Sequence, residues 1–439
     1  MQLKGKQVTV LGMARSGVAA AELLLAQGAH VRAIDQNPQT LILNGEPYRI
    51  EPQSPAAFVN ADLIVLSPGV PPDLTDIKLA RQRGVPVIGD LELASWFLRG
   101  KMIGITGSNG KTTTTALVAH ILNASGIAMQ VGGNIGRPPA IMVNASRDEQ
   151  WNVLELSSFQ LETTETFHAQ VGAVLNITPD HLDRHHTMKA YIDAKGRLFA
   201  NQTAGDFAVL NADDAACIAY ASHLQAKVLW FSSTRECDGA FLGNGSIFLR
   251  DTAMMEQREV PLRGVHNLEN TMAAALIANL AGATDEQIRS AVMTFPGVEH
   301  RLEFVRELQG VGWYNDSKAT NVDATLKAIA AFDGGLWVIL GGKDKDGDYS
   351  ALAGPLAAKA RGVFLIGAAA NKIASQLEET VFMVQAGTLA NAVALAQVSA
   401  TKGDTVLLAP ACASFDQFQN FEHRGREFKR LIHELGGRS

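Results

Sequence analysis

The chain has 439 residues, of which 47% are hydrophobic and 19% charged, and its 38 Lys and Arg against 44 Asp and Glu give a net charge of −6. This length fits about three domains of ~150 residues each, and the composition is too apolar for a disordered chain. The slight negative charge argues against a general surface for nucleic acid.

Neither a membrane span nor an export signal is expected. The longest apolar stretches, such as residues 273–283, are far shorter than the ~20 residues that cross a bilayer. Polar residues interrupt the apolar run near the N-terminus. The three cysteines, Cys217, Cys237 and Cys412, are odd in number and widely spaced, which fits neither a disulfide framework nor a zinc site. Reduced thiols of this kind indicate a cytoplasmic protein.

The first ~90 residues alternate strands and helices, which predicts a parallel sheet covered on both faces. Residues 7–11 are an expected strand, followed by a turn at 12–17 and a helix over 18–27 that Gly28 closes. Further strands are expected at 30–34 and 62–66. Because ligands of such sheets lie at the carboxyl ends of the strands, the turn, Asp35 and residues 67–70 should surround one crevice.

Two more α/β blocks follow. In the second, strands are expected at 102–106, 151–156 and 173–177, helices at 91–98, 189–200 and 267–280, and mixed or antiparallel strands between 207 and 249. The third block starts near 296–301, with strands at 302–308, 337–340, 363–366, 382–384 and 405–408 separated by helices. This again predicts a doubly wound sheet.

Residues 106–112 (TGSNGKT) stand between an apolar strand and a helix. Backbone N–H groups in such a loop hold phosphate oxygens, assisted by the helix dipole. Lys111 would reach the β- and γ-phosphates, and the Thr112 hydroxyl would bind Mg²⁺. Ile105 stands where the strict motif has glycine, so an ordinary glycine-rich turn is the alternative.

A phosphate loop of this type needs an acid at the end of a nearby strand to hold the metal. Glu155 ends the strand at 151–156 and is the candidate. Residues 180–186 (DHLDRHH) follow the strand at 173–177, and His181 is the preferred metal contact because the His spacing matches no zinc motif. Without further support, these groups could equally be solvated surface residues.

Six blocks, in order along nearly the whole chain, resemble the Mur ligases. They are TGSNGKTT (106–113), LELSSFQLE (154–162), NITPDHLDRH (176–185), HNLEN (266–270), NDSKATN (315–321) and PACASFDQFQNFEHRG (410–425). The resemblance implies an α/β protein with three domains. These are a Rossmann-like UDP-sugar domain (1–93), a central P-loop ATPase with a mainly parallel sheet and a small antiparallel one (94–297), and a Rossmann-like amino-acid domain (298–439).

The implied reaction joins D-glutamate to UDP-N-acetylmuramoyl-L-alanine with ATP, through an acyl phosphate, and releases ADP and phosphate. The chain would use two Mg²⁺ ions and a CO₂-derived carbamate on Lys195, and would act as a monomer. Without the resemblance, Lys195 would be interpreted as an ordinary surface lysine of a helix.

The resemblance also assigns residues to each ligand. The catalytic residues are Lys111, His181 and Lys195. ATP is bound by Gly107, Ser108, Asn109, Gly110, Lys111, Thr112, Thr113, Asn267, Asn270, Arg301 and Asp316. Metal ligands are Thr112, Glu155, His181 and carbamylated Lys195. The UDP-sugar is bound by Arg15, Ser16, Asp35, Gln36, Ser67, Gly69 and Asn134, and D-glutamate by Lys318, Thr320, Lys345, Ser414 and Phe421.

Several of these assignments have alternatives. Lys343 competes with Lys345 for the D-glutamate site, and Ser414 with Gln417 forms a capping-box pattern that predicts a helix start. The alternative functions are those of a different Mur ligase, of a folylpolyglutamate synthetase-like ligase, or of a nucleotide-dependent switch that hydrolyses ATP without ligation. An NAD oxidoreductase is disfavoured, because Ala14 replaces the middle glycine of the dinucleotide motif. Cys412 is interpreted as a buried structural thiol.

Overall fold

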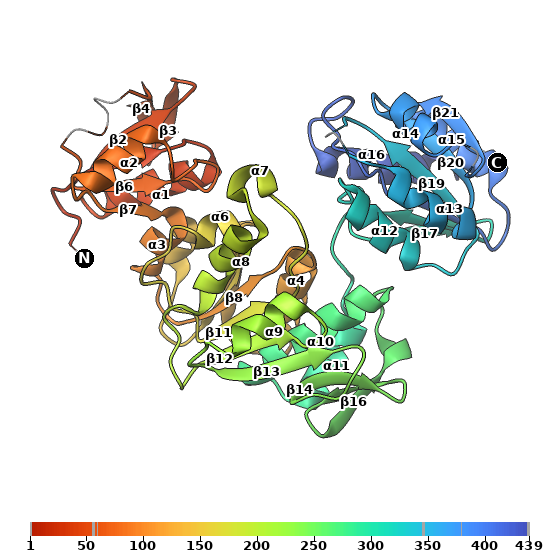
Figure 1. Cartoon of the computed structure of the whole chain (residues 1–439), viewed down its shortest axis with the longest axis horizontal. Helices are drawn as coiled ribbons and strands as arrows, with labels where there is room; N and C mark the ends of the chain where they lie inside the picture. Colours follow the sequence, from red (N-terminus) through yellow and green to blue (C-terminus); the bar gives the residue numbers. More distant parts are fainter. Residues whose placement is uncertain (1, 55–57, 59, 345–346, 379, 437–439) are drawn as a thin grey trace. The chain divides into compact units, whose positions relative to one another are not determined.

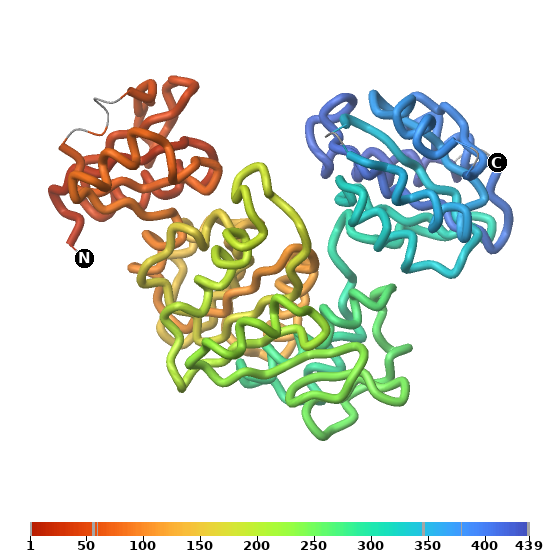
Figure 2. Tube along the Cα trace, viewed as in Figure 1, coloured from red at the N-terminus to blue at the C-terminus, as the bar shows by residue number. Residues whose placement is uncertain are grey.

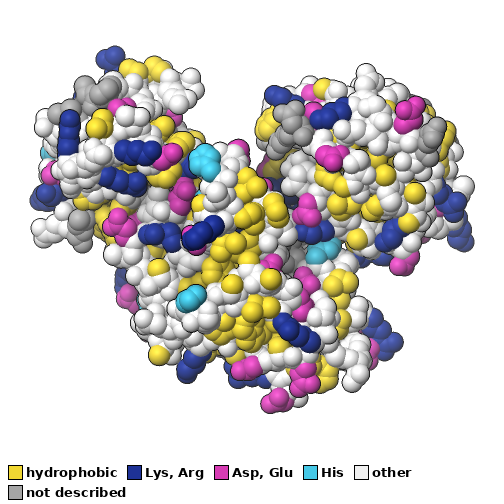
Figure 3. All heavy atoms as spheres, viewed as in Figure 1, with side chains coloured by type: hydrophobic (Ala, Val, Ile, Leu, Met, Phe, Trp, Pro, Cys, Tyr) yellow, Lys and Arg dark blue, Asp and Glu magenta, His cyan; other side chains and the backbone are white. Residues whose placement is uncertain are grey.

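The computed structural model describes residues 2–54, 58, 60–344, 347–378 and 380–436. Two compact units are present: Met1–Val260 with Glu269–Phe295, and Pro261–Leu268 with Pro296–Ser439. Acidic and basic side chains are both scattered over the face drawn in Figure 3. Among the described residues, no helix is long and apolar enough to cross a membrane.

The N-terminal sheet of the first unit is entirely parallel, with strand order β5-β2-β1-β6-β7. Its elements are β1 (Gln7–Leu11), α1 (Arg15–Ala26), β2 (His30–Asp35), β5 (Glu51–Pro52), β6 (Leu63–Leu66), α2 (Thr75–Gln82) and β7 (Val87–Gly89), with a separate antiparallel hairpin of β3 (Thr40–Leu43) and β4 (Glu46–Arg49). The predicted strand at 7–11 is confirmed. The helix end is confirmed too, since Gly28 takes the left-handed conformation (φ +77°) just after α1.

A second, larger sheet follows in the same unit. Its strands are β8 (Lys101–Thr106), β9 (Met129–Gly133), β10 (Trp151–Glu155), β11 (Val171–Val174), β12 (Phe207–Asn211), β13 (Lys227–Ser232), β14 (Gly239–Gly243), β15 (Ser246–Leu249) and β16 (Thr252–Glu256). The helices are α4 (Lys111–Ala124), α5 (Pro139–Met142), α6 (Ser158–Leu161), α7 (Leu182–His185), α8 (Met188–Gly196), α9 (Ala215–Ala221), α10 (Val265–Leu280) and α11 (Asp285–Met293). The order is β16-β15-β14-β13-β12-β11-β8-β10-β9.

The prediction of mixed or antiparallel strands between residues 207 and 249 is confirmed, and the strands there are mixed. β12, β13 and β14 all pair in parallel, and only β15 and β16 are antiparallel. The strand expected to run to residue 177 ends at Val174. Past that point the backbone bonds to the phosphate loop instead, since the Ser108 N–H donates to the Asn176 carbonyl at 2.9 Å.

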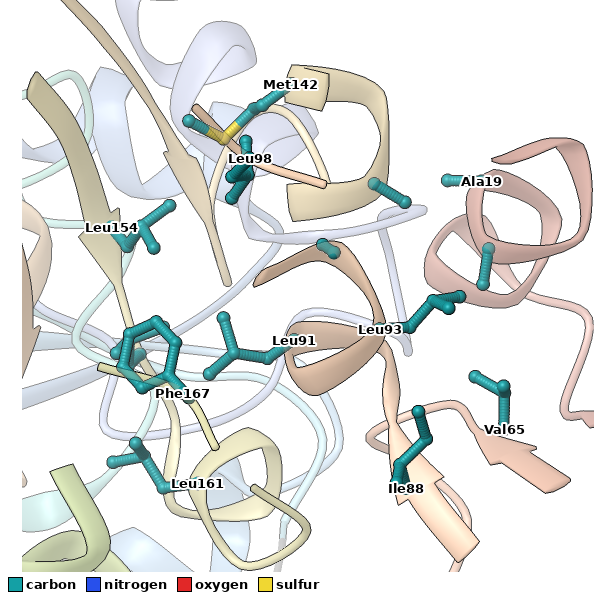
Figure 4. Close-up of a cluster of buried hydrophobic side chains, with 14 of the residues drawn as sticks. Ala19, Val65, Ile88, Leu91, Leu93, Leu98, Met142, Leu154, Leu161 and Phe167 are labelled. Carbon is teal, nitrogen blue, oxygen red and sulfur yellow. The ribbon is translucent and has the colours of Figure 1, made fainter. Parts of the chain in front are cut away.

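Helix α3 (Asp90–Ser95) joins the two sheets of the first unit (Figures 1 and 2). Leu93 points towards Ala19, Val65 and Ile88 of the N-terminal sheet, while Leu91 points the opposite way, towards Phe167. Figure 4 shows these side chains on the two sides of the helix within one buried cluster. The two domains of this unit therefore share a continuous apolar core, which fixes one against the other.

The second unit contains one six-stranded sheet in the order β17-β18-β22-β19-β20-β21, parallel except for β17. Its strands are β17 (Glu303–Leu308), β18 (Val311–Asn315), β19 (Leu336–Gly341), β20 (Ala360–Ile366), β21 (Met383–Gly387) and β22 (Thr405–Leu408). Its helices are α12 (Val322–Ala330), α13 (Ala353–Lys359), α14 (Ala370–Gln376), α15 (Leu389–Ser399) and α16 (Phe421–Glu434).

Both faces of this sheet are buried. Along β19, Val338 and Leu340 belong to one apolar cluster and Trp337 and Ile339 to the other. Such two-sided burial is expected of a parallel sheet between helices, so the predicted doubly wound pattern is confirmed. Strand β18 was not predicted from the sequence.

Glu92 of α3 is a buried structural anchor. Its carboxylate accepts hydrogen bonds from the backbone N–H groups of Glu165 (2.8 Å), Thr166 (2.9 Å) and Phe167 (3.0 Å), and from the Trp96 indole (3.0 Å). Burial alone would raise the pKa of Glu92, but bonds led by that of the Thr166 hydroxyl outweigh it and lower the pKa below 4.5. The carboxylate thus holds the 165–167 loop of the central domain against the connecting helix.

We predict that Glu92→Gln lowers the free energy of unfolding of the first unit by ~2–3 kcal/mol at pH 7, because an amide NH₂ would face backbone donors. A depressed carboxyl pKa stabilises the fold above the ordinary value of 4.5, and this contribution disappears as the pH falls through the folded value. Urea unfolding at pH 7 and pH 4 measures both effects. Glu149→Gln, at an exposed position, is the control. A mutant as stable as the wild type at pH 7 would contradict the anchor role.

Candidate functional site

The phosphate-loop geometry predicted from the sequence is present between β8 and α4. Gly107 (φ +152°) and Gly110 (φ +82°) both take conformations that favour glycine. A Cβ on Gly110 would lie 2.2 Å from the Asn270 Oδ1 atom, so the loop leaves no room for a side chain there. Thr112 and Thr113 lie in the first turn of α4. The N-terminus of α4, directly after this tight loop, thus forms a cradle for an anion.

Two lysines meet at one carbonyl of this loop. Lys111 Nζ donates to the Gly107 oxygen at 2.7 Å and to the Ser108 oxygen at 2.8 Å. Lys195 Nζ donates to the same Gly107 oxygen at 2.8 Å. Lys195 is only 1% exposed, so it is not a surface lysine of α8. Burial, followed by the charge of Lys111, lowers the pKa of Lys195 well below its usual value.

The segment after β11 forms one wall of the loop. The Asn109 N–H donates to the Asn176 Oδ1 atom at 2.8 Å. The Ser108 hydroxyl donates to the Thr178 carbonyl at 2.9 Å and lies 3.0 Å from the Tyr191 hydroxyl of α8. Two of the recognised blocks, 106–113 and 176–185, are therefore hydrogen-bonded to each other.

Glu155, the predicted metal-binding acid, contacts Asn134, which was predicted to bind the UDP-sugar. Its Oε1 atom accepts from the Asn134 side chain at 2.9 Å, while the Asn134 N–H donates to the Glu155 carbonyl at 2.8 Å. This approach requires Gly133, because a Cβ there would lie 2.2 Å from the Glu155 carbonyl. Glu155 Oε2 is buried and has no hydrogen-bond partner in the described structure. A buried carboxylate oxygen in this state fits a cation ligand.

In the 180–186 segment, the side chains of His181, Arg184 and His185 have different surroundings. His181 (φ +53°) is about half exposed, and its ring lies 4.8 Å from that of Phe159 in α6. His185 is buried 2.9 Å from the Ser158 hydroxyl, and burial followed by the Arg184 charge lowers its pKa to about 4. Arg184, which sequence reasoning missed, donates to Glu162 and to the Val70 carbonyl. It thereby ties this segment to the 67–70 turn.

Within the described residues, no three His, Cys, Asp or Glu side chains come close enough together to hold a metal. A Mg²⁺ ion at Glu155 would therefore need further oxygen ligands. The Thr112 hydroxyl, phosphate oxygens, water and a carbamate are all hard oxygen donors of the kind this ion prefers.

The residues predicted for the UDP-sugar surround the start of α1. The Asp35 carboxylate accepts from the Met13 N–H at 2.6 Å, and Arg15 donates to the Gly136 carbonyl at 2.6 Å, in the loop that also carries Asn134. The turn needs Gly17, since a Cβ there would lie 1.8 Å from the Gly12 carbonyl. The other members differ in exposure: Ser67 is buried, Ser16 half-buried, and Gln36 and Gly69 exposed.

The remaining residues predicted for ATP lie in several places. Asn270 accepts from the Thr114 hydroxyl at 3.3 Å beside the loop. Asn267, at the start of α10, donates to the Arg263 carbonyl at 2.7 Å. In the second unit Asp316 is buried next to Arg301. Burial raises its pKa to about 7 even though the Arg301 charge opposes the rise.

Of the residues predicted for D-glutamate, Lys318 and Thr320 follow β18, Ser414 follows β22, and Phe421 begins α16. The Lys318 amine lies 3.8 Å from the centre of the Phe421 ring, and the Thr320 N–H donates to the Lys318 carbonyl at 2.8 Å. Ser414 is 2% exposed. Lys345 lies outside the described residues. Lys343, its competitor, pairs through its backbone with Ala413.

The capping-box interpretation of Ser414 is wrong. The chain makes a single turn there, with the Gln417 and Phe418 N–H groups both bonded to the Ser414 carbonyl. Helix α16 begins only at Phe421, where the Asn420 side chain accepts from the His423 N–H at 2.7 Å. A better N-cap six residues downstream therefore sets the helix start.

Comparisons with known proteins fit this geometry. Residues 6–89 match the family described as "Mur ligase MurD-like, N-terminal domain", residues 105–278 "Mur ligase middle domain", and residues 300–412 "Mur ligase, glutamate ligase domain". The UDP-N-acetylmuramoylalanine--D-glutamate ligase of Solibacter usitatus is 56% identical over 99% of both chains. That of Acidobacterium capsulatum is 50% identical over 98% of this chain and 97% of its own.

Solved structures agree at the level of the fold. The UDP-N-acetylmuramate-alanine ligase of Thermotoga maritima superposes with a TM-score of 0.61 at 19% identity, covering 98% of this chain and all of its own. A pseudomurein peptide ligase from Methanothermus fervidus gives the same values. The site and its relatives define an ATP-dependent ligase with a phosphate loop. The chain belongs to the Mur ligase family.

We predict that Gly110→Ala weakens ATP binding at least ~10-fold, because the new methyl group would displace Asn270 and reshape the cradle. Gly126→Ala, at the other end of α4, is the matched control, since Gly126 also has a positive φ (+71°) but has open space around it. Both variants should lose ~1 kcal/mol of stability from the backbone conformation. Calorimetric titration with MgATP separates them, and wild-type affinity in Gly110→Ala would refute the cradle.

Proposed function

We propose that this chain joins D-glutamate to UDP-N-acetylmuramoyl-L-alanine in peptidoglycan precursor synthesis, with conversion of ATP to ADP and phosphate. The observation that carries this proposal is the 56% identity, over 99% of both chains, to a relative named for that reaction. The phosphate loop with its two lysines and Glu155 supplies the ATP chemistry that such a reaction needs. The ligand roles given above for individual residues are part of the proposal.

The reaction has to activate a carboxylate, which is a poor electrophile. The alanine carboxylate would attack the γ-phosphorus of ATP, ADP would leave, and an acyl phosphate would form. The amine of D-glutamate would then attack the acyl carbon, and phosphate would leave as the amide forms. The catalytic task is to position the reactants and stabilise the developing negative charge.

The described residues divide this task. Lys111, at the start of α4, would neutralise charge on the transferred phosphoryl group, and the N-terminus of α4 would hold its oxygens. Asn134, bonded to Glu155 and in the same loop as the Arg15 contact, would place the sugar next to the metal side of the site. When bound, Mg²⁺ would neutralise phosphate oxygens, with Glu155, Thr112 and His181 as the residues to hold it.

Three further points belong to the proposal. Domain boundaries fall at residues 93/94 and 297/298, outside the three matched ranges. The reaction takes place in the cytoplasm, where ATP and nucleotide sugars are found and where Cys217, Cys237 and Cys412 would stay free thiols. The chain acts as a monomer, which light scattering would test.

We predict phosphate release that requires all three of ATP, UDP-N-acetylmuramoyl-L-alanine and D-glutamate, and that L-glutamate does not replace D-glutamate. Lys111→Ala should lower kcat by orders of magnitude, because charge on the transferring group would be unneutralised. A continuous phosphate assay with each substrate omitted in turn measures this. Release of phosphate from ATP alone would instead favour the nucleotide-switch alternative, and use of another amino acid would favour a different ligase.

We further propose that Lys195 is carbamylated. Its amine is buried on the Gly107 carbonyl, next to Lys111, and among the described residues no carboxylate lies within 4 Å of it. The lowered pKa of Lys195 favours the neutral amine that reacts with CO₂, and its conversion into an anion would place an oxygen ligand for Mg²⁺ beside Lys111. An arginine could not undergo this change, because its guanidinium stays protonated.

Lys195→Ala should then abolish ligation in a folded protein, and added acetate should restore part of the activity by filling the vacated anion position. Lys195→Arg should stay inactive. Lys189→Ala is the matched control on the same helix, since Lys189 is exposed and pairs with Asp193. Mass spectrometry of the intact protein in bicarbonate would report the carbamate directly. Full activity of Lys195→Ala would show this lysine to be dispensable.

A further inference from the structure

Arg424 of α16 connects two loops of the second unit, one after β18 and one after β22. Its guanidinium donates to the Ser317 hydroxyl (3.0 Å) and carbonyl (2.9 Å), which follow β18. It also donates to the carbonyls of Cys412 (3.2 Å) and Ala413 (3.4 Å), which follow β22. The side chain is 1% exposed, so all of these bonds are shielded from water. The planar fork of arginine suits such a bridge, and a lysine ammonium cannot reproduce it.

Among the described residues, Arg424 makes no ion pair. All of its acceptors are neutral oxygens, and no carboxylate of the described residues lies within 4 Å of it. Asp416 attracts it from farther away and raises its pKa, but by less than burial lowers it, so the compensation is partial. Burial lowers the pKa of Arg424 to about 10, so the group is still a cation at neutral pH. Keeping such a cation buried is unfavourable unless an anion compensates for it.

The β22 loop is also strained. Ala411 has φ +58°, a conformation that costs a residue with a side chain ~1–2 kcal/mol. Its N–H bonds to the Ala319 carbonyl at 2.9 Å, and Arg424 then holds the carbonyls of the next two residues. These contacts fix the path by which the chain reaches Ser414. They connect it to the loop that carries Lys318.

We propose that Arg424 is a positioning residue of the amino-acid site. Its fork holds the loop that carries Lys318 and the loop that carries Ser414 in a fixed relation to each other. This inference rests on the proposed function, because Lys318 and Ser414 are assigned to D-glutamate there. Arg424 itself, beneath the loops, would not touch the substrate.

The test is steady-state kinetics on Arg424→Lys, which keeps the charge and loses the fork. The KM for D-glutamate should rise at least ~10-fold, while the KM values for ATP and UDP-N-acetylmuramoyl-L-alanine change less than ~2-fold. Arg430→Lys is the matched control, because Arg430 is on the same helix but half exposed, in pairs with Glu427 and Glu434. It should match the wild type.

Ser317→Ala gives a second, milder variant in case Arg424→Lys does not fold. It removes one acceptor of the fork and the bond from the Ser317 hydroxyl to the Phe421 carbonyl (2.8 Å), and should raise only the D-glutamate KM, by ~3-fold or more. Unchanged D-glutamate KM in a folded variant, or an equal rise in all three KM values, would overturn the positioning role. Failure of the proposed function is distinguishable, since it would appear in the wild type as phosphate release that does not depend on D-glutamate.

Discussion

The Gly107 carbonyl is the point on which the central site depends. It accepts from both Lys111 and Lys195, so two amines that would repel each other as cations are held side by side at the end of β8. Such an arrangement favours ligands with several negative charges, since an anion relieves the repulsion. The surrounding loop follows from this constraint: it needs glycine at 107 and 110, and a second wall from the 176–178 segment.

Packing and hydrogen bonds connect that site to the N-terminal sheet of the first unit. Glu92 and the two-sided apolar packing of α3 fix the N-terminal sheet against the central one. Above this core, Arg15 bonds to the loop that holds Asn134, and Asn134 bonds to Glu155. Residues predicted for the sugar and for the metal therefore form one continuous set. A ligase needs this, because its carboxylate must meet the phosphoryl group within a few tenths of an ångström of the reactive geometry.

Much of the fold could be predicted from local patterns. The strands at 7–11 and 405–408 and the loop at 106–112 have strong signals, namely apolar runs next to glycines. Strand β18 (VGWYN) was missed because its aromatic and polar residues lack a clear period, although its position between β17 and β22 buries it. The site residues with the strongest tertiary roles, Arg184 and Arg424, were missed for a related reason. Each has a partner more than 100 residues away in the sequence, Val70 for Arg184 and Ser317 for Arg424.

Buried charged groups separate into two kinds by the direction of their pKa shifts. At Glu92 the fold favours the charged form, since hydrogen bonds lower the pKa despite burial, and the group only holds a loop in place. At Lys195 and Arg424 burial lowers the pKa, and at Asp316 it raises it to about 7, so in these cases the fold disfavours the charge. Asp90, buried beside Ser16 with a pKa raised to about 6, behaves in the same way. All four of these groups adjoin residues predicted to bind ligands, where a bound ion would supply the missing compensation.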